Sequence, residues 1–218
     1  MHHVKEHIKG RTVVRYYGNT LHAQQISSFL PFEFTEIHPR FLAELTEYTK
    51  RKIELITYAN LGQPLKQTAF IKPVSDKWFE ARVYKEGENI SGTPDDADKI
   101  YVSEIVKFVN EVRCFVLGTE ILTASLYRIN GQVWDSTDLP PDKINFDDRI
   151  NDTPIPQYVK EICTKCRLPK GVVIDFGQLE NGEWGLIEFN EAYGSGLYYC
   201  DPRPAFDVII NSQQDITP

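Results

Sequence analysis

The sequence has few of the residues that mark specialised protein classes. It contains four cysteines among 218 residues, too few for a small scaffold held together by disulfides. No stretch of about 18 consecutive apolar residues occurs, so no transmembrane helix and no membrane partner are predicted. Repeats and low-complexity tracts are absent. With 41% hydrophobic and 25% charged residues, the composition predicts a soluble globular chain and excludes disordered, collagenous and fibrous proteins.

An excess of positive charge is also absent. The chain carries 24 lysines and arginines against 31 acidic residues, which gives a net charge of −7. Proteins that bind nucleic acids independently of sequence usually have the opposite sign, so no nucleic-acid partner is expected. Residues 1–20 lack the apolar stretch of a signal peptide, and we therefore expect a cytoplasmic protein with reduced thiols. The acidic balance still allows a polyphosphate to bind through a metal ion.

Runs of β-branched and aromatic residues predict a strand-rich chain interrupted by separate helices. The predicted strands are segments 12–17, 53–58, 69–72, 78–84, 100–106, 111–117, 120–129, 132–135, 171–176 and 184–190. Helices are predicted over 39–51, 156–167 and 204–210, next to prolines, and loops over 86–99 and 136–152. The pattern predicts an α+β fold of mostly antiparallel sheets, in two lobes with a cleft.

Two Asn-Gly pairs predict tight hairpins, at 130–131 and at 181–182. If 181–182 form a two-residue loop, Asp175 lies directly opposite Glu188 on the neighbouring strand. Asn190, two residues beyond Glu188, then points to the same face of the sheet. The sequence therefore predicts that three oxygen-bearing side chains converge.

Two carboxylates that face each other among apolar neighbours need a cation or a proton. Oxygen ligands of this kind suit Mg²⁺, which often takes one or two carboxylates and completes its shell with water and phosphates. The alternative is a solvated polar face without a metal, on which the same register also opposes Glu180 and Glu183. A bulge at Gly177 would shift the register.

Four motifs follow one another between about residue 68 and residue 200. The first is Phe70-Ile71-Lys72-Pro73, a lysine at a strand end before proline, and the second is Glu104 in the segment 101–106. The third is Glu111, and the fourth is Asp175 followed by Glu188-Phe189-Asn190. In order and spacing they resemble the ATP-grasp superfamily. Glu111-x-Arg113 and the segment 190–196 are similar to its RimK-related branch of bacterial and phage proteins.

The resemblance implies a nucleotide site in a cleft between two lobes. By this resemblance Lys72 neutralises phosphate oxygens of ATP, and Glu104 accepts from the adenine amino group. Ile105 and Val106 offer backbone hydrogen bonds to the adenine, while Glu111 holds the ribose hydroxyls. The metal ligands implied are Asp175, Glu188 and Asn190, which bind Mg²⁺, with Mn²⁺ as a substitute.

Other residues depart from the family pattern or have open roles. No glycine-rich loop follows the lysine strand, and Lys77 in that segment is a candidate to supply charge in its place. Arg113 points to the same face as Glu111, so it either pairs with that acid or presents its fork to phosphate.

Substrate contacts are expected after the metal strand. Gly194, Ser195 and Gly196 are candidates to offer backbone N–H groups to a substrate or an acyl phosphate, or they form an ordinary turn. Arg203 is a candidate to bind a substrate carboxylate. The domains expected are a reduced N-terminal region, 1–67, and an ATP-grasp-like domain, 68–218, with a small lobe over 68–105 and a large lobe over 106–218.

The function implied is an ATP- and Mg²⁺-dependent ligase that activates a carboxylate as an acyl phosphate, releases ADP and joins the acyl group to an amine. Amino acids and peptides or proteins are the expected substrates, and the oligomeric state is not indicated. One alternative is a nucleotide-binding module without ligase activity. Another is a structural α+β protein whose acidic hairpin is only a solvated face.

Overall fold

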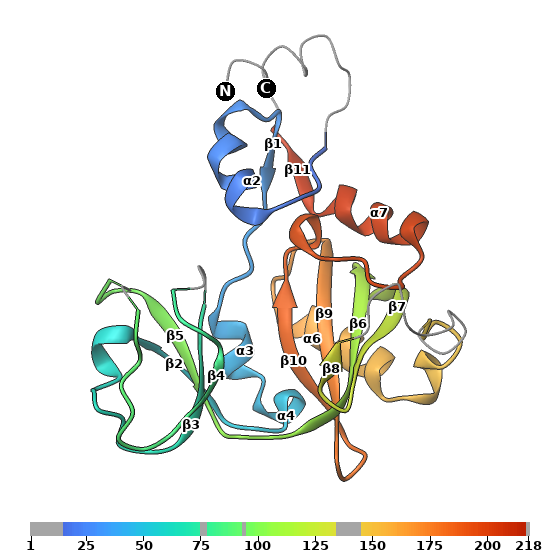
Figure 1. Cartoon of the computed structure of the whole chain (residues 1–218). Helices are drawn as coiled ribbons and strands as arrows, with labels where there is room; N and C mark the ends of the chain where they lie inside the picture. Colours follow the sequence, from blue (N-terminus) through green and yellow to red (C-terminus); the bar gives the residue numbers. More distant parts are fainter. Residues whose placement is uncertain (1–14, 75–77, 93–94, 134–144, 217–218) are drawn as a thin grey trace. The chain divides into compact units, whose positions relative to one another are not determined.

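The computed structural model describes residues 15–74, 78–92, 95–133 and 145–216, and these fall into two compact units (Figure 1). One unit is the segment 38–107. The other combines the flanking segments 1–37 and 108–218. Mixed helices and antiparallel sheets confirm the predicted α+β class. The division of the sequence into functional domains at residue 67 stays a prediction.

The unit of residues 38–107 is built on a four-stranded antiparallel sheet with the order β2-β5-β3-β4. Its strands are β2 (Ile53–Thr57), β5 (Lys99–Ser103), β3 (Ala69–Pro73) and β4 (Arg82–Tyr84), accompanied by α3 (Arg40–Glu44), α4 (Thr46–Thr49) and the 3₁₀ turn η2 (Tyr58–Asn60). Apolar side chains pack on one face of the sheet as the core of this unit. They are Leu65, Ala69, Ile71, Phe79, Tyr84, Ile90 and Ile100.

The predicted helix over 39–51 is wrong in its length and continuity. Leu45 has a ψ of 43°, outside the helical range, and separates α3 from α4. Lys50 adopts a left-handed conformation with φ of 56° and ends the second segment. Leu45 and Tyr48 are both buried, so the break lets two side chains enter the core that one straight helix would not place together.

The second unit contains a five-stranded antiparallel sheet with the order β10-β9-β6-β7-β8. The strands are β6 (Phe108–Leu117), β7 (Glu120–Ile129), β8 (Gln132–Val133), β9 (Gly171–Leu179) and β10 (Trp184–Asn190). The helices of its C-terminal half are α6 (Ile155–Lys165) and α7 (Pro202–Asn211), with 3₁₀ turns η3 (Ile150–Asp152) and η4 (Ala192–Gly194). The helices predicted over 156–167 and 204–210 are thereby confirmed, each within two residues.

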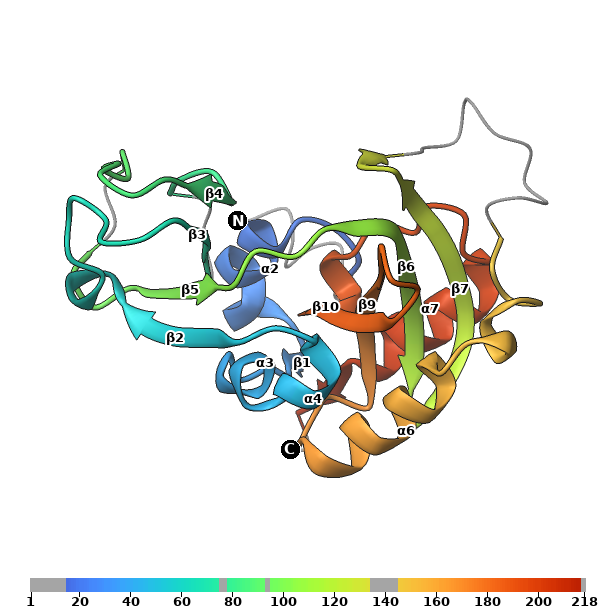
Figure 2. The ribbon, with the colours of Figure 1, turned by 90° about the horizontal axis from the view of Figure 1, so that it is seen from below.

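The two long helices pack on the faces of this sheet (Figure 2). Side chains of α7 form a core with Phe115 and Val173, which lie on the face that also carries Arg113 and Asp175. On α6, Tyr158 meets the ring of Phe176, which points to the opposite face. Neither helix in the described part of the chain is long and apolar enough to cross a bilayer, and the same holds for the other described helices.

A small two-stranded sheet joins the described start and end of the second unit. It pairs β1 (Phe32–Phe34) with β11 (Gln213–Asp215), beside α2 (Thr20–Ile26) and the turn η1 (Ser27–Phe29). The Gln213 amide accepts from Tyr16 N–H at 2.8 Å and donates to Tyr16 C=O at 2.7 Å. The predicted strand over 12–17 is wrong for residues 15–17, which form no strand, and its other residues lie outside the described chain.

Close packing of α7 on the start of β9 makes Gly171→Ala a strong test of this fold. An added Cβ would lie 2.0 Å from the Val208 carbonyl oxygen and 2.8 Å from Ser212 N, and both are backbone atoms. Since neither atom can rotate away, we expect the substitution to cost about 2–3 kcal/mol in urea unfolding. Gly182→Ala is the control: its Cβ meets nothing within 4 Å, and only its φ of 89° is strained. That control should cost about 1 kcal/mol. Equal costs for both variants would contradict the packing.

Candidate functional site

The hairpin of β9 and β10 turns through three residues, not two. Leu179 N–H donates to Glu183 C=O at 2.8 Å, and Gly182 N–H donates to Leu179 C=O at 2.9 Å. Gly182 adopts φ of 89°, as in three-residue loops that end with a left-handed glycine. The predicted two-residue loop is therefore wrong, and Glu180 does not lie opposite Glu183.

A β-bulge restores the predicted pairing further along the same hairpin. The register shifts between Leu186, which pairs with Phe176, and Glu188, which pairs with Asp175. The extra residue in the loop and the extra residue in β10 cancel. The prediction that Asp175 faces Glu188 is thus confirmed, although one of its two premises was wrong.

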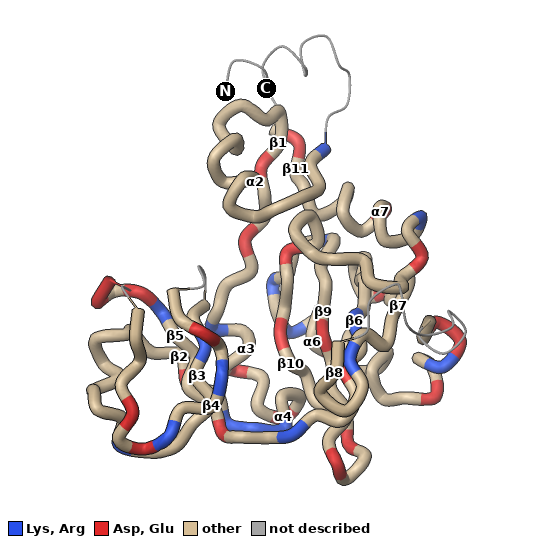
Figure 3. Tube along the Cα trace, viewed as in Figure 1, with Lys and Arg blue, Asp and Glu red and all other residues tan. Residues whose placement is uncertain are grey.

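Asn190 joins the two acids as predicted. Its Nδ2 donates to Asp175 Oδ2 at 3.1 Å and to Glu188 Oε1 at 3.3 Å. Asp175 is fully buried, whereas Glu188 and Asn190 are half-buried. The three side chains form the core of what we call the acidic cluster: Asp175, Glu188, Asn190 and Glu111, together with Arg113. In Figure 3 acidic positions on β9 and β10 lie beside basic positions on β6.

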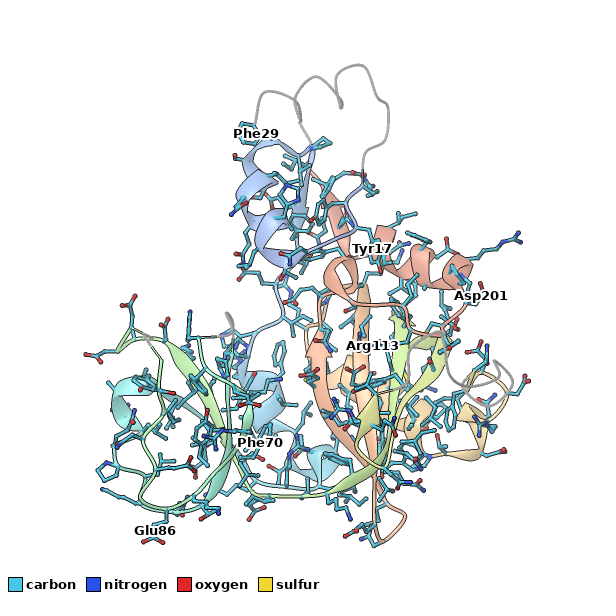
Figure 4. The ribbon with its side chains drawn as sticks, in the orientation of Figure 1. Tyr17, Phe29, Phe70, Glu86, Arg113 and Asp201 are labelled. Carbon is cyan, nitrogen blue, oxygen red and sulfur yellow. The ribbon has the colours of Figure 1, made fainter. Side chains whose placement is uncertain are left out.

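Arg113 forms a two-pronged ion pair with Asp175. Its Nε donates to Oδ1 at 2.9 Å and its Nη2 donates to Oδ2 at 2.7 Å. Arg113 is only 7% exposed, so the pair is almost completely removed from solvent. The predicted pairing with Glu111 is wrong, because the fork binds the acid on the adjacent strand β9, and a contact of Arg113 with phosphate stays a prediction. Figure 4 labels Arg113 on this sheet.

Burial and charge act against each other in this pair. Burial raises the pKa of the Asp175 carboxyl to about 6, since the Arg113 guanidinium offsets only part of the cost and Glu188 and Glu111 add repulsion. Burial would lower the pKa of Arg113, but Asp175 raises it above its ordinary value. The site is therefore short of positive charge, which is the condition that favours a bound cation.

Glu111 lies on the same face as Arg113 and is held by two neighbours on β7. Tyr127 Oη donates to Glu111 Oε2 at 2.6 Å, and Arg128 Nη1 lies 3.4 Å from Oε1. Sequence reasoning missed Tyr127 as a site residue. The register shifts where Glu111 pairs with Arg128 and Val112 pairs with Leu126, so Tyr127 is the extra residue of a bulge. Nothing in the sequence marks this bulge.

The predicted substrate segment reaches the cluster at one point. Gly196 C=O accepts from Arg113 Nη1 at 3.2 Å. The Ser195 hydroxyl donates to Glu191 C=O at 2.8 Å, and Ser195 C=O accepts from Tyr17 Oη at 3.1 Å. Gly194 belongs to η4. Arg203 is exposed in the first turn of α7, where its N–H donates to Asp201, and the described contacts do not connect it with the acidic cluster.

The predicted nucleotide residues of the other unit lie on and after its sheet. Lys72 is half-buried on β3 and pairs with Tyr101, while its neighbours on both sides point into the core. The strand predicted over 100–106 is wrong at its end, because β5 stops at Ser103. Glu104 accepts from Lys52 N–H at 2.8 Å, while Ile105 and Val106 follow outside the strand. Lys77 lies outside the described residues.

The donor atoms of the acidic cluster suit magnesium. In the described part of the chain no three His, Cys, Asp or Glu side chains are grouped for a metal, so soft or closed sites are not indicated there. Asp175 and Glu188 supply two carboxylates and Asn190 supplies an amide, all hard oxygen ligands. Two acids with one amide are what Mg²⁺ needs when phosphates and water complete its shell. These residues therefore fit the metal that the resemblance implies.

Comparisons with known proteins give three solved structures with a related arrangement. The macrocyclase MdnC bound with precursor peptide MdnA from Microcystis aeruginosa MRC is 14% identical, over 88% of this chain and 66% of that chain, with a TM-score of 0.45. The ATP-grasp ligase PsnB complexed with minimal precursor is 14% identical, over 80% and 62%, with a TM-score of 0.40. A bifunctional glutathione synthetase from Pasteurella multocida is 12% identical, over 78% and 35%, with a TM-score of 0.38.

The chain thus spans less than two thirds of the length of these structures. Among curated proteins no sequence matches. A family profile described as an ATP-grasp domain, family 2 of its clade, matches residues 48–208, which is more than half of the chain. The predicted superfamily is thereby confirmed, and the RimK-related branch stays a prediction. The chain belongs to this family of ATP-grasp domains.

Proposed function

We propose that this chain is an ATP-dependent ligase that joins a carboxylate to an amine and releases ADP. The observation that supports it is the convergence of Asp175, Glu188 and Asn190 on one face, in a chain of the ATP-grasp family. A carboxylate oxygen of the substrate attacks the γ-phosphorus of ATP, and the bond to the leaving ADP breaks. The amine then attacks the acyl carbon of the acyl phosphate and inorganic phosphate leaves.

Asp175, Glu188 and Asn190 would hold Mg²⁺, for which Mn²⁺ can substitute. When bound, the metal supplies positive charge beside the phosphates. The chain's own task is to keep the ligand carboxylates ionised and aimed. Arg113 does this for Asp175, since its two parallel hydrogen bonds fix the carboxylate plane and favour its charged form. In this proposal Arg113 positions a metal ligand.

Residues of both units would bind the nucleotide. We propose Lys72 and Lys77 for phosphate oxygens, Glu104, Ile105 and Val106 for the adenine, and Glu111 for the ribose. Lysine is a mobile point charge suited to phosphate, and carboxylates accept from amino and hydroxyl groups. The end of β5 leaves the backbone groups of residues 105–106 outside the sheet, which supports this part.

The substrates are proposed by class. Gly194, Ser195 and Gly196 follow the metal strand and are proposed to approach the acyl group, with Arg203 as a contact for a second carboxylate. Because Gly196 C=O accepts from Arg113, a group bound along this segment would lie next to the acidic cluster. Amino acids and peptides, each with an amine and a carboxylate, are the first compounds to screen.

A nucleotide-binding module without ligase activity is the second candidate. Both carboxylate oxygens of Asp175 accept from Arg113, which reduces the lone pairs left for a metal. The segment 74–79 also lacks the glycines of a phosphate-covering loop. This candidate predicts binding of ATP without turnover for any substrate pair.

Calorimetric titration with a non-hydrolysable ATP analogue is the deciding experiment. We expect the analogue to bind about tenfold or more tightly with Mg²⁺ than without, since the metal bridges acids and phosphates. A screen of amino acids and peptides for ADP release follows, and ligation should produce ADP and phosphate. Binding that Mg²⁺ leaves unchanged would sink the metal site, and formation of AMP and pyrophosphate would sink the proposed chemistry.

A further inference from the structure

Tyr198 adopts a backbone conformation that large side chains avoid. Among the described residues three that are not glycine have a positive φ: Lys50, Asn130 and Tyr198, with φ of 56°, 50° and 48°. Lys50 ends a helix and Asn130 lies in a hairpin loop, where such angles are common. Tyr198 lies in a turn closed by Cys200 N–H donating to Leu197 C=O at 3.0 Å. At this turn position glycine or asparagine is usual.

The Tyr198 ring contacts two residues of the acidic cluster region. It stacks on the Tyr127 ring, with centroids 4.8 Å apart and an interplanar angle of 14°. The Arg113 Cζ lies 4.9 Å from the Tyr198 centroid and 5.4 Å from the Tyr127 centroid, within the range of cation–π attraction. The strained turn thus delivers a ring to Arg113, which a glycine at the same position would not supply.

Tyr127 connects this stack to Glu111. Its hydroxyl donates to Glu111 Oε2 at 2.6 Å, and its place in a β-bulge turns its ring toward the face of Arg113. The segment that carries Tyr198 also touches Arg113 through the Gly196 carbonyl, at 3.2 Å. One aromatic pair therefore links the ion pair of Arg113 and Asp175 with the proposed ribose acid.

We propose that the Tyr127–Tyr198 stack positions Arg113, and through it Asp175, for the reaction. The two rings limit the movement of the guanidinium across the sheet, while Tyr127 fixes the Glu111 carboxylate. Both tyrosines are positioning residues that act through Arg113 and Glu111. The link to the reaction rests on the proposed function, but the link to Arg113 does not.

Hydrogen exchange at Arg113 Nε–H tests the positioning without any ligase assay. The NMR signal is assigned by its loss in Arg113→Lys. We expect Tyr198→Ala to speed this exchange about tenfold, because Arg113 loses a cation–π contact, and Tyr198→Phe to leave it within about twofold. Tyr198→Gly keeps the turn at low conformational cost and should behave like Tyr198→Ala. Phe206→Ala, which removes an equally exposed ring of α7, should have no effect.

The kinetic arm separates positioning from simple stability. Tyr198→Ala and Tyr198→Gly should lower kcat about tenfold with the KM for ATP within about twofold, and Tyr198→Phe should restore kcat. Tyr127→Phe keeps the ring but loses the hydrogen bond to Glu111, so it should raise the KM for ATP about fivefold. These changes should appear at temperatures where each variant remains folded.

The outcomes distinguish the two proposals. Unchanged Arg113 exchange in both Tyr198→Ala and Tyr198→Gly would overturn the positioning role. A Tyr198→Phe variant as impaired as Tyr198→Ala would overturn it too, because the ring would not be the cause. Faster exchange in a protein whose wild type neither binds nor turns over ATP would support the link to Arg113 and refute the proposed function.

Discussion

Arg113→Met is expected to destabilise the unit that contains the five-stranded sheet by about 3–5 kcal/mol. The substitution leaves the Asp175 carboxylate, which is fully buried, without the two hydrogen bonds that compensate its charge. Removing one partner of a buried pair costs more than the pair itself contributes, because the remaining charge keeps its full desolvation penalty. Urea unfolding followed by circular dichroism measures the loss.

Two companion variants make this expectation specific. Arg113→Met combined with Asp175→Leu removes both charges and should recover most of the lost stability, since an apolar pair of similar size needs no compensation. Arg113→Lys keeps the charge but not the fork, and should fall between the wild type and Arg113→Met. Additive effects of the Arg113 and Asp175 substitutions would show that the two side chains do not interact.

The cost of Arg113→Met should also depend on pH. Without the guanidinium the folded-state pKa of Asp175 rises further above its unfolded value, so the folded state binds more protons between the two values. Stability is then greatest below the unfolded pKa and falls as the pH rises through the folded pKa. The difference between Arg113→Met and wild type is therefore expected to shrink from about pH 8 to about pH 5. A difference independent of pH would contradict an uncompensated carboxylate.

Local turn chemistry was enough to predict part of the site. The Asn-Gly signal at 130–131 gives a two-residue loop with Arg128 opposite Val133, as predicted. At 181–182 the same signal is part of a longer loop, and a bulge in β10 corrects the register. Because both irregularities add one residue, the facing of Asp175 and Glu188 was predicted correctly for partly wrong reasons.

Long-range pairing explains what the sequence did not reveal. Arg113 and Asp175 are 62 residues apart, and only the adjacency of β6 and β9 brings them together. The strand β11 has the sequence Gln-Gln-Asp, without β-branched or aromatic residues, and forms because β1 supplies its partner. Neither case has a local signal, since hydrogen bonds to a distant strand decide it.

Glu188→Gln should lower Mg²⁺-dependent ATP turnover about 100-fold or more while the fold stays intact. Loss of one carboxylate from the proposed metal site removes a charged ligand that the neutral amide replaces poorly. Glutamine can keep the hydrogen bond in which Oε1 accepts from Asn190 Nδ2, and Glu188 is half-buried, so we expect a stability change within about 0.5 kcal/mol. Coupled detection of ADP and urea unfolding measure the two quantities.

Glu183→Gln is the matched control on the same hairpin. It removes the same charge near the exposed turn, where Glu183 accepts from Asn181, and should leave turnover within about twofold. Raising Mg²⁺ should partly restore Glu188→Gln, since a weaker site fills at higher metal concentration, and affinity for the ATP analogue without Mg²⁺ should not change. If Glu183→Gln were as impaired as Glu188→Gln, loss of general negative charge would explain both, and the acidic cluster would no longer be assigned to a metal. If Glu188→Gln turned over ATP normally, the hairpin would be the solvated polar face that its sequence alone also allows.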